Sequence, residues 1–295
     1  MYVSTGISGW RHGTENSDND AMQVPWRKRV SRLVRARWRT RVLSRHGIAL
    51  VAETKNGTLA VDARDFNVSR HLLERGEYDW PQITLLQSLV APGARLVVVG
   101  AHIGSVLIPL ARVCGAPSTL AFEPSPRNRR LLAMNLVLNG LAGVRVEASA
   151  VGDAPGTARF TENPVNSGNS RLSPGGEIEV PVVTLDASVP QTWPEVDLLV
   201  VDAEGFEVQV LRGASAVLPR TRALYVEFAP EQLAEQGCSV AQFAALVAAA
   251  FSVVHAVRGT RVERIGDSLA DYLARHSARG THFDLLAMRE PLASC

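Results

Sequence analysis

The stretch RLVVVGAHIGSVLIPLARV, residues 95–113, decides the fold of this chain. Its first part, RLVVV (95–99), is the continuous apolar run expected of a strand covered on both faces of a parallel sheet. Gly100 and Gly104 follow, and an apolar segment over residues 105–113 then reads as a helix despite Pro109. A long apolar run also suggests a membrane span, but glycines, a histidine and a proline interrupt this one. We therefore predict a strand, a turn and a helix.

Downstream of this unit, apolar runs alternate with helical segments. The further predicted strands are 118–122, 144–148, 196–202, 223–228, 252–257 and 282–288, and the predicted helices are 126–140, 206–218 and 240–251. This alternation predicts a doubly wound α/β fold with a mostly parallel sheet of seven strands. A polar loop over 162–176 precedes an extra strand over 177–185. The last strand follows a long insertion rather than a clear helix, so we expect it to run antiparallel beside its neighbour.

Three regions are expected along the chain. Residues 1–22 are polar and predict a disordered tail. Residues 23–94 predict an extension made of a basic amphipathic helix, a hairpin over 49–62 with Asn56-Gly57 in its tight turn, and a cap helix running to Val90. Residues 95–290 form the ligand-binding α/β domain.

The charge of the chain is uneven, although its net value is only +2. Residues 24–46 carry nine Lys/Arg and no Asp/Glu. This basic arm suits contact with an anionic membrane surface, contact with a nucleic-acid backbone, or a helix that packs on its own domain through Trp26 and Trp38. Three widely spaced cysteines and the lack of an apolar leader favour a cytoplasmic protein.

Polar residues follow the predicted strands, where doubly wound sheets bind their ligands. Gly100 and Gly104 let the backbone approach a ligand closely. Glu123 follows the second strand, where a carboxylate can accept both hydroxyls of a ribose. The aspartate and amides of the 150–153 segment suit an adenine edge. Asp202 and Glu204 follow the fourth strand.

A glycine turn with an acid about 20 residues later also describes a nicotinamide-binding domain. That fingerprint is GxGxxG, whereas Gly100 and Gly104 have three residues between them and no third glycine at the required place. The spacing disfavours a nicotinamide oxidoreductase.

Several motifs stand in the order and spacing of one family. They are GAHIG (100–104), AFEPSP (121–126), AVGD (150–153), SGNS (167–170), VTLD (183–186), DAEGFEVQVLRGA (202–214) and YVEF (225–228). From about Glu74 to Glu227, roughly half of its length, the chain resembles the FkbM-type methyltransferases.

The resemblance implies a Rossmann-like class I methyltransferase that uses S-adenosyl-L-methionine (SAM), with residues 95–290 as the SAM-binding domain. It further implies O-methylation of a hydroxyl or carboxylate on a small molecule, such as a natural product or a sugar. The residues expected at the cofactor are Glu77, Tyr78, Gly100, Ala101, His102, Gly104, Glu123, Pro124, Ser125, Asn128, Val151, Gly152, Asp153 and Asp202.

A hydroxyl acceptor gains from a base that takes its proton during attack. The candidate catalytic residues are Asp202, Glu204, Glu227 and His102, and His255 is a further candidate at the pocket. We expect no metal ion, although the first three carboxylates would suit Mg²⁺.

Two residues depart from the family pattern. Val98 stands where the family usually has an aspartate, and His102 where it usually has an asparagine. The lost carboxylate keeps open a catalytically impaired SAM-binding protein, and the basic arm keeps open an RNA methyltransferase. We expect a small-molecule acceptor rather than a nucleic acid, and the sequence does not give the oligomeric state.

Overall fold

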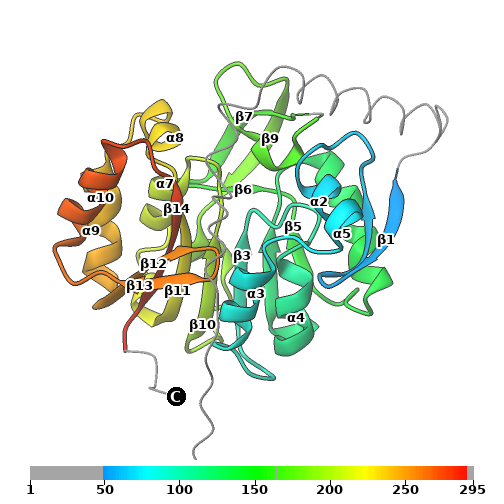
Figure 1. Cartoon of the computed structure of the whole chain (residues 1–295), viewed down its shortest axis with the longest axis horizontal. Coiled ribbons are helices and arrows are strands. Elements are labelled where there is room, and N and C mark those ends of the chain that lie inside the picture. Colours follow the sequence, from blue (N-terminus) through cyan, green and yellow to red (C-terminus); the bar gives the residue numbers. More distant parts are fainter. Residues whose placement is uncertain (1–48, 164, 291–295) are drawn as a thin grey trace, which may run out of the picture.

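The computed structural model describes residues 49–163 and 165–290. The predicted tail and the basic arm lie outside these residues. The centre of the fold is an eight-stranded sheet (Figure 1) in the order β13-β12-β14-β11-β10-β3-β4-β5. In chain order these strands are β3 (Leu96–Val99), β4 (Thr119–Phe122), β5 (Arg145–Glu147), β10 (Val196–Val201), β11 (Thr221–Phe228), β12 (Val253–Arg258), β13 (Arg261–Arg264) and β14 (Phe283–Met288).

The sheet is mostly parallel, as predicted. Strand β3 pairs in parallel with β4 and β10, and β11 pairs in parallel with β10. Strand β14 runs antiparallel to β11 and β12, which confirms the expectation for the last strand. The seven predicted strands all lie in this sheet, and β13 adds an unpredicted eighth as the hairpin partner of β12.

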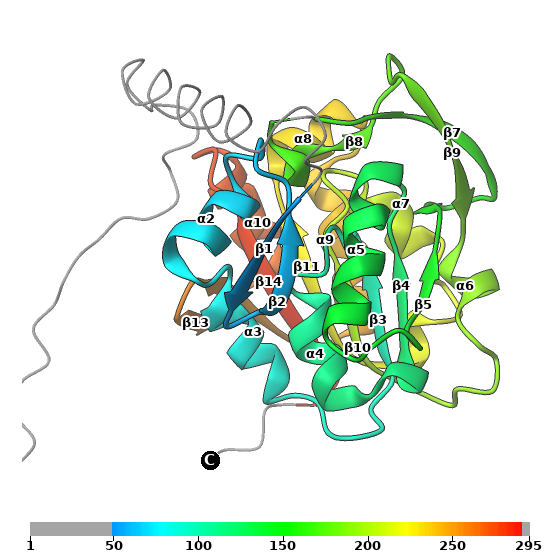
Figure 2. The ribbon, with the colours of Figure 1, turned by 90° about the vertical axis from the view of Figure 1, so that its right-hand side faces the viewer.

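Helices cover both faces of the sheet (Figures 1 and 2). Side chains alternate along β3, so that Val97 and Val99 pack in one core and Leu96 and Val98 in the other. The first core is closed by α7 (Glu207–Arg212), α9 (Val240–Ala250) and α10 (Leu269–Ser277). The second is closed by α2 (Val68–Arg75), α3 (Trp80–Gln87), α4 (Leu107–Cys114) and α5 (Pro126–Leu138). None of the helices in the described part of the chain is long and apolar enough to span a membrane.

A second, four-stranded sheet fills most of the segment between β5 and β10. It consists of β6 (Ala150–Val151), β7 (Gly156–Thr161), β8 (Arg171–Leu172) and β9 (Ile178–Val183), in the order β6-β9-β7-β8. Only β9 was predicted. The segment from residue 156 to residue 172, called the insertion below, contains β7 and β8. A short helix, α6 (Leu185–Ser188), leads on to β10.

The N-terminal hairpin consists of β1 (Leu50–Thr54) and β2 (Gly57–Val61). Its turn differs from the prediction, because Gly57 already pairs with Thr54 and the two turn residues are Lys55 and Asn56. Gly57 has a positive φ of 126°, whereas Asn56 does not. The buried Asn56 side chain instead joins the hairpin to the domain, since it donates to the carbonyls of Tyr78 and Ser105 at 2.7 and 2.9 Å.

Several predicted boundaries were wrong. The helix predicted over 206–218 ends at Arg212 with Gly213 as its C-cap, and a Cβ on Gly213 would lie 1.9 Å from the Gly152 carbonyl oxygen. The cap helix ends at Gln87 rather than Val90. Helices α8 (Pro230–Glu235) and α10 were not predicted. Helix α10 lies in the segment before β14, for which we predicted no clear helix.

Candidate active site

The glycine turn after β3 is tightly enclosed by its neighbours. The amides of Gly100 and Ala101 both donate to the Phe122 carbonyl of β4 at 3.0 Å. On the other side, a Cβ on Gly100 would lie 1.8 Å from the Asp202 carbonyl oxygen at the end of β10. Gly100 also has a φ of 83°, which L side chains rarely adopt. The close approach of three strand ends therefore requires glycine here.

Glu123, after β4, is buried and organises the turn. Its Oε2 accepts from the His102 amide at 2.7 Å, and its Oε1 accepts from the Ser125 amide at 2.9 Å. Asn128 Nδ2 donates to Oε1 at 3.4 Å. Burial raises the pKa of Glu123 to about 7, against these hydrogen bonds. Oε1 thus accepts two hydrogen bonds, whereas Oε2 accepts one and has a second lone pair for a further donor.

His102 joins the glycine turn to the insertion. It has a φ of 50°, and its Nε2 lies 2.8 Å from Ser167 Oγ. Burial lowers the pKa of His102 to about 4, so the imidazole is neutral at physiological pH. His102 therefore connects the glycine turn to the SGNS segment, residues 167–170.

The insertion lies over the carboxyl edge of the main sheet and contacts the rest of the protein on two sides. On one side the Phe66 amide donates to the Val165 carbonyl at 3.0 Å. On the other, Arg171 forms an ion pair with Glu235 at 2.9 Å. There Gln236 Nε2 also donates to the Leu172 carbonyl at 3.1 Å. Figure 1 shows the small sheet above the central strands, and the insertion therefore forms one boundary of the site.

Three predicted carboxylates gather at the ends of β10 and β11. Asp202 has solvent-exposed surface, yet burial and the charges of Glu227 and Glu204 raise its pKa well above the ordinary value. Burial and Glu227 likewise raise the pKa of Glu204, although Gln232 donates to its Oε2 at 2.8 Å. The charges of Asp79, Asp202 and Glu204 act together on Tyr78, whose pKa is raised well above its ordinary value.

Sequence reasoning missed the residues that β14 contributes. His282 Nε2 lies 2.9 Å from Glu227 Oε1, and this hydrogen bond raises the pKa of His282 to about 9. Asp284 pairs with Glu227 across β14 and β11, and it accepts from Tyr225 Oη at 2.7 Å. An antiparallel strand brings its start, rather than its end, to the carboxyl edge. Applying that rule to the predicted last strand would have identified both residues.

Backbone strain concentrates at the same edge. Among the described residues, positive φ outside glycine occurs at Asp79, His102 and Glu204, with values of 49°, 50° and 50°. Such conformations cost free energy and persist where the surroundings enforce them, often at functional sites. His102 and Glu204 lie three residues after the ends of β3 and β10, and the charges of Asp79 and Glu204 both act on Tyr78.

The other predicted residues fall into two groups. Ala101, Gly104, Pro124, Ser125, Asn128, Val151 and Gly152 lie in or beside the strand ends, and Ser125 caps α5 by accepting from the Asn128 amide at 3.1 Å. Glu77 and Asp153 are more peripheral. Glu77 forms an ion pair with Lys55 at 2.5 Å, and Asp153 is exposed. His255 lies within β12, and burial lowers its pKa.

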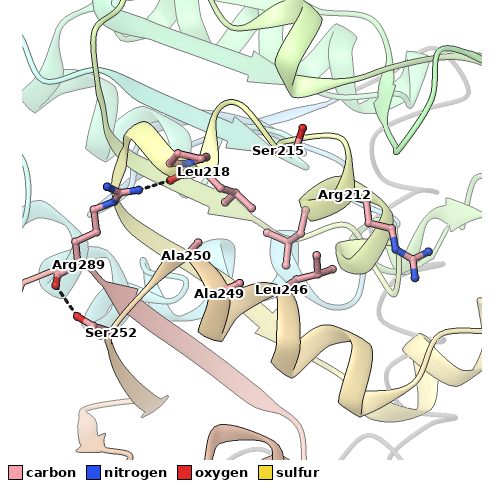
Figure 3. A pocket seen from close by; sticks show the side chains of 10 residues that line it. Arg212, Ser215, Leu218, Leu246, Ala249, Ala250, Ser252 and Arg289 are labelled. Atoms are coloured by element: carbon pink, nitrogen blue, oxygen red, sulfur yellow. Dashed lines mark hydrogen bonds between the residues drawn. The ribbon is translucent and has the colours of Figure 1, made fainter.

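The described residues contain no group of three or more His, Cys, Asp or Glu side chains placed to hold a metal ion. A cavity of about 670 Å³ lies at the opposite, amino end of the sheet (Figure 3). It is lined by Leu211, Arg212, Ser215, Leu218, Pro219, Leu246, Ala249, Ala250, Ser252 and Arg289. None of the predicted site residues lines this cavity.

Solved structures with a similar arrangement are methyltransferases of low sequence identity. A precorrin-6y C5,15-methyltransferase from Geobacter metallireducens is 13% identical with a TM-score of 0.40, and the match covers 71% of this chain and 87% of that one. The O-methyltransferase TomG from Streptomyces achromogenes is 16% identical with a TM-score of 0.41, covering 71% and 79%. Both TM-scores are below 0.5, and the family assignment rests on sequence.

The sequence comparisons identify the family more specifically than the structural comparisons do. Methyltransferase sdnD of Sordaria araneosa is 30% identical, and the match covers 40% of this chain and 59% of that protein. The chain thus spans less than two thirds of this curated relative. The methyltransferase FkbM domain matches residues 99–255, more than half of the chain. That stretch runs from the glycine turn through Glu123, the insertion and the Asp202–Glu207 segment to β12, and the chain therefore belongs to the FkbM methyltransferase family.

Proposed function

We propose that this protein is a SAM-dependent methyltransferase that methylates an oxygen of a small molecule. The observation that carries the proposal is the pairing of a side-chain-free turn at Gly100 with the buried carboxylate of Glu123 at the next strand end. The relatives named above are methyltransferases, which supports the same reaction class.

The residues present fit this cofactor. Oε2 of Glu123 accepts one protein donor, the His102 amide, and so keeps a lone pair for a ribose hydroxyl. Glu227 Oε2 is buried and has no hydrogen-bond partner, which suits the ammonium group of the methionine end. Ser149 Oγ, directly after β5, is also buried without a partner on the adenine side. Donors and acceptors are thus available at each expected part of the ligand.

When bound, the cofactor supplies a methyl group on a sulfonium, and transfer breaks the C–S bond while the acceptor oxygen forms the new C–O bond. The protein's main contribution is alignment, because holding two reactants in line removes most of the entropic cost of their encounter. Glu123 and the glycine turn fix one partner, and the insertion borders the space for the other. A carboxylate of Asp202, Glu204 or Glu227 takes the hydroxyl proton at an oxygen, and the raised pKa values of Asp202 and Glu204 suit a base near neutral pH.

Calorimetric titration with SAM, S-adenosylhomocysteine and NAD tests this proposal. We expect micromolar binding of the first two and none of NAD. In Glu123→Ala the affinity should fall roughly 10- to 100-fold, because hydrogen bonds to a charged group contribute about 1.5–3 kcal/mol. Glu147→Ala is the matched control, since Glu147 ends the next strand but pairs at the surface with Arg145.

Each outcome separates the candidate functions. Binding of NAD instead of SAM would support the oxidoreductase. Binding of neither would overturn the proposal. Tight SAM binding without methyl transfer to any acceptor in a broad screen would favour a catalytically impaired SAM-binding protein. That alternative rests on Val98, which is buried in the core where the family usually has an aspartate.

A further inference from the structure

His282 lies directly before β14 and bonds to the candidate site through Glu227. Its Nε2 is 2.9 Å from Glu227 Oε1. Strand β14 runs antiparallel to β11 with Asp284 opposite Glu227, so His282, two residues before Asp284, is the diagonal neighbour of Glu227 on the same face of the sheet. The register of the two strands therefore places an imidazole beside a carboxylate at the carboxyl edge.

The backbone on both sides of His282 is held in place. Phe283 is buried, and its ring centroid lies 5.3 Å from that of Phe228 and 5.2 Å from that of His276. On the other side, Thr281 Oγ1 donates to the His276 carbonyl at 2.9 Å. The imidazole is thus presented from a fixed backbone, although the His282 side chain is 58% exposed.

Glu227 relies on this histidine for its side-chain partner. Among the described residues, His282 is the side chain that bonds to Glu227 Oε1, and no lysine or arginine there forms an ion pair with this carboxylate. The Glu227 side chain is only 15% exposed, and its Oε2 is buried without a partner. A hydrogen bond at Oε1 restricts the rotation of the carboxylate, and it leaves Oε2 as the atom available to a ligand.

The same contact determines where negative charge lies at the site. Burial raises the pKa of Asp284 to about 7 and the pKa values of Asp202 and Glu204 well above their ordinary range, so these acids retain protons near neutral pH. The hydrogen bond with Glu227 raises the pKa of His282 to about 9, so the imidazole is protonated there. A charged donor favours the ionised form of the carboxylate that accepts from it. Glu227 therefore carries the charge that its neighbours lack.

We propose that His282 is a positioning residue, which orients Glu227 and keeps it ionised so that Glu227 Oε2 accepts the ammonium group of the cofactor's methionine end. His282 acts through Glu227 and need not touch the cofactor or the acceptor. An ammonium group supplies both the donor and the positive charge that a buried, unpartnered carboxylate oxygen requires. This inference rests on the proposed function and adds to it the residue that prepares the cofactor site.

Two ligands that differ at the methionine end test the inference. S-adenosylhomocysteine has the amino-acid end, whereas 5′-methylthioadenosine has the same adenosine and a thioether without it. We expect the unchanged protein to bind S-adenosylhomocysteine at least tenfold more tightly. His282→Ala should weaken this ligand by about tenfold and methylthioadenosine by less than about twofold, because hydrogen bonds to a charged group contribute this much. Calorimetric titration of the full chain measures both affinities.

Two further variants separate positioning from a structural role. Glu227→Gln keeps the shape of the side chain but removes its charge, so it should also reduce the preference for S-adenosylhomocysteine by about tenfold. His276→Ala is the matched control, because it removes packing against Phe283 beside His282 but no contact with Glu227. The preference should stay unchanged in this variant.

Failure of the unchanged protein to bind S-adenosylhomocysteine would overturn the proposed function itself. Where that ligand binds, four results would overturn the inference about His282. They are equal affinity of the unchanged protein for both ligands, equal weakening of both ligands in His282→Ala, a preference that survives Glu227→Gln, and the same loss of preference in His276→Ala.

Discussion

At the scale of single residues, Gly100 is the described glycine at which an added Cβ would come closest to a neighbouring atom. Replacing it with alanine would place a Cβ 1.8 Å from the Asp202 carbonyl, so a strand end must move. We expect Gly100→Ala to lower the free energy of unfolding by about 3 kcal/mol, combining the positive-φ penalty with the clash. Cofactor binding should be lost with it. Urea unfolding and calorimetry measure the two effects.

Gly93 supplies a matched control for that substitution. Its φ of 84° is almost the same, but a Cβ there would meet nothing within 4 Å. Gly93→Ala should therefore lower the free energy of unfolding only by the penalty for positive φ, about 1–2 kcal/mol. Equal losses in the two variants would show that the close approach of β3 and β10 has no energetic importance.

At the scale of elements, the contact between the insertion and the glycine turn depends on Ser167. Its Oγ is 2.8 Å from His102 Nε2, and the serine is buried. Ser167→Ala leaves the imidazole nitrogen without its partner, so we expect a loss of about 1–2 kcal/mol. Amide hydrogen exchange over residues 165–170 should accelerate because the insertion opens locally.

Arg171→Ala is the comparison for this prediction. The Arg171–Glu235 ion pair is partly exposed, and pairs of that kind contribute about 0–1 kcal/mol. Exchange should change little in this variant. Faster exchange in Arg171→Ala than in Ser167→Ala would mean that the insertion is held mainly at α8 and not at the glycine turn.

The buried strands of the main sheet could be predicted from sequence because they are apolar throughout. Strand β13 was missed for the opposite reason: Arg261, Val262 and Arg264 are exposed at the sheet edge and leave no apolar pattern. Strand β7 is mostly exposed and β8 has only two residues, and they form through pairing with each other and with β9. Tertiary pairing, rather than local propensity, produces these elements.

The candidate site was predictable where it follows parallel strands. Glu123, Asp202 and Glu227 all lie at strand ends, and their positions follow from the sheet rule alone. The antiparallel rule places His282 and Asp284 at the same edge, but the contacts of these residues with Glu227 and Tyr225 depend on the register of β14 with β11, which comes from the folded sheet. The contact of His102 with Ser167 joins residues 65 positions apart, for which the sequence carries no local signal.

At the scale of the whole molecule, stability should fall as pH rises from about 6.5 to 8. Burial raises the pKa of Glu123 and Asp284 to about 7 and that of Glu207 to about 8. In this window the native state therefore binds more protons than the unfolded state, and deprotonation favours unfolding. The deprotonation of Glu207 alone should lower the free energy of unfolding by on the order of 2 kcal/mol across this pH range. His282, raised to about 9 by Glu227, acts in the same direction.

Urea unfolding at several pH values measures this dependence on the protein without cofactor. The window begins near 6.5 because His102, with a pKa lowered to about 4, has the opposite effect below that value. Glu207→Gln should flatten the slope. A stability that rises from pH 6.5 to 8 would contradict the assignment of these acids as protonated in the native state.

Cofactor binding should also release protons from the carboxyl groups at the site. Burial holds the pKa values of Asp202 and Glu204 well above their ordinary range, so both acids are partly protonated in the free protein. A cation favours their ionised forms, and linkage then requires proton release and an affinity that increases with pH.

SAM and S-adenosylhomocysteine form a matched pair here, because they differ by the methyl group and the sulfonium charge. Calorimetry in two buffers of different ionisation enthalpy should show more protons released by SAM. Equal release would mean that the sulfonium lies outside the field of Asp202 and Glu204, and the base would then have to be sought elsewhere.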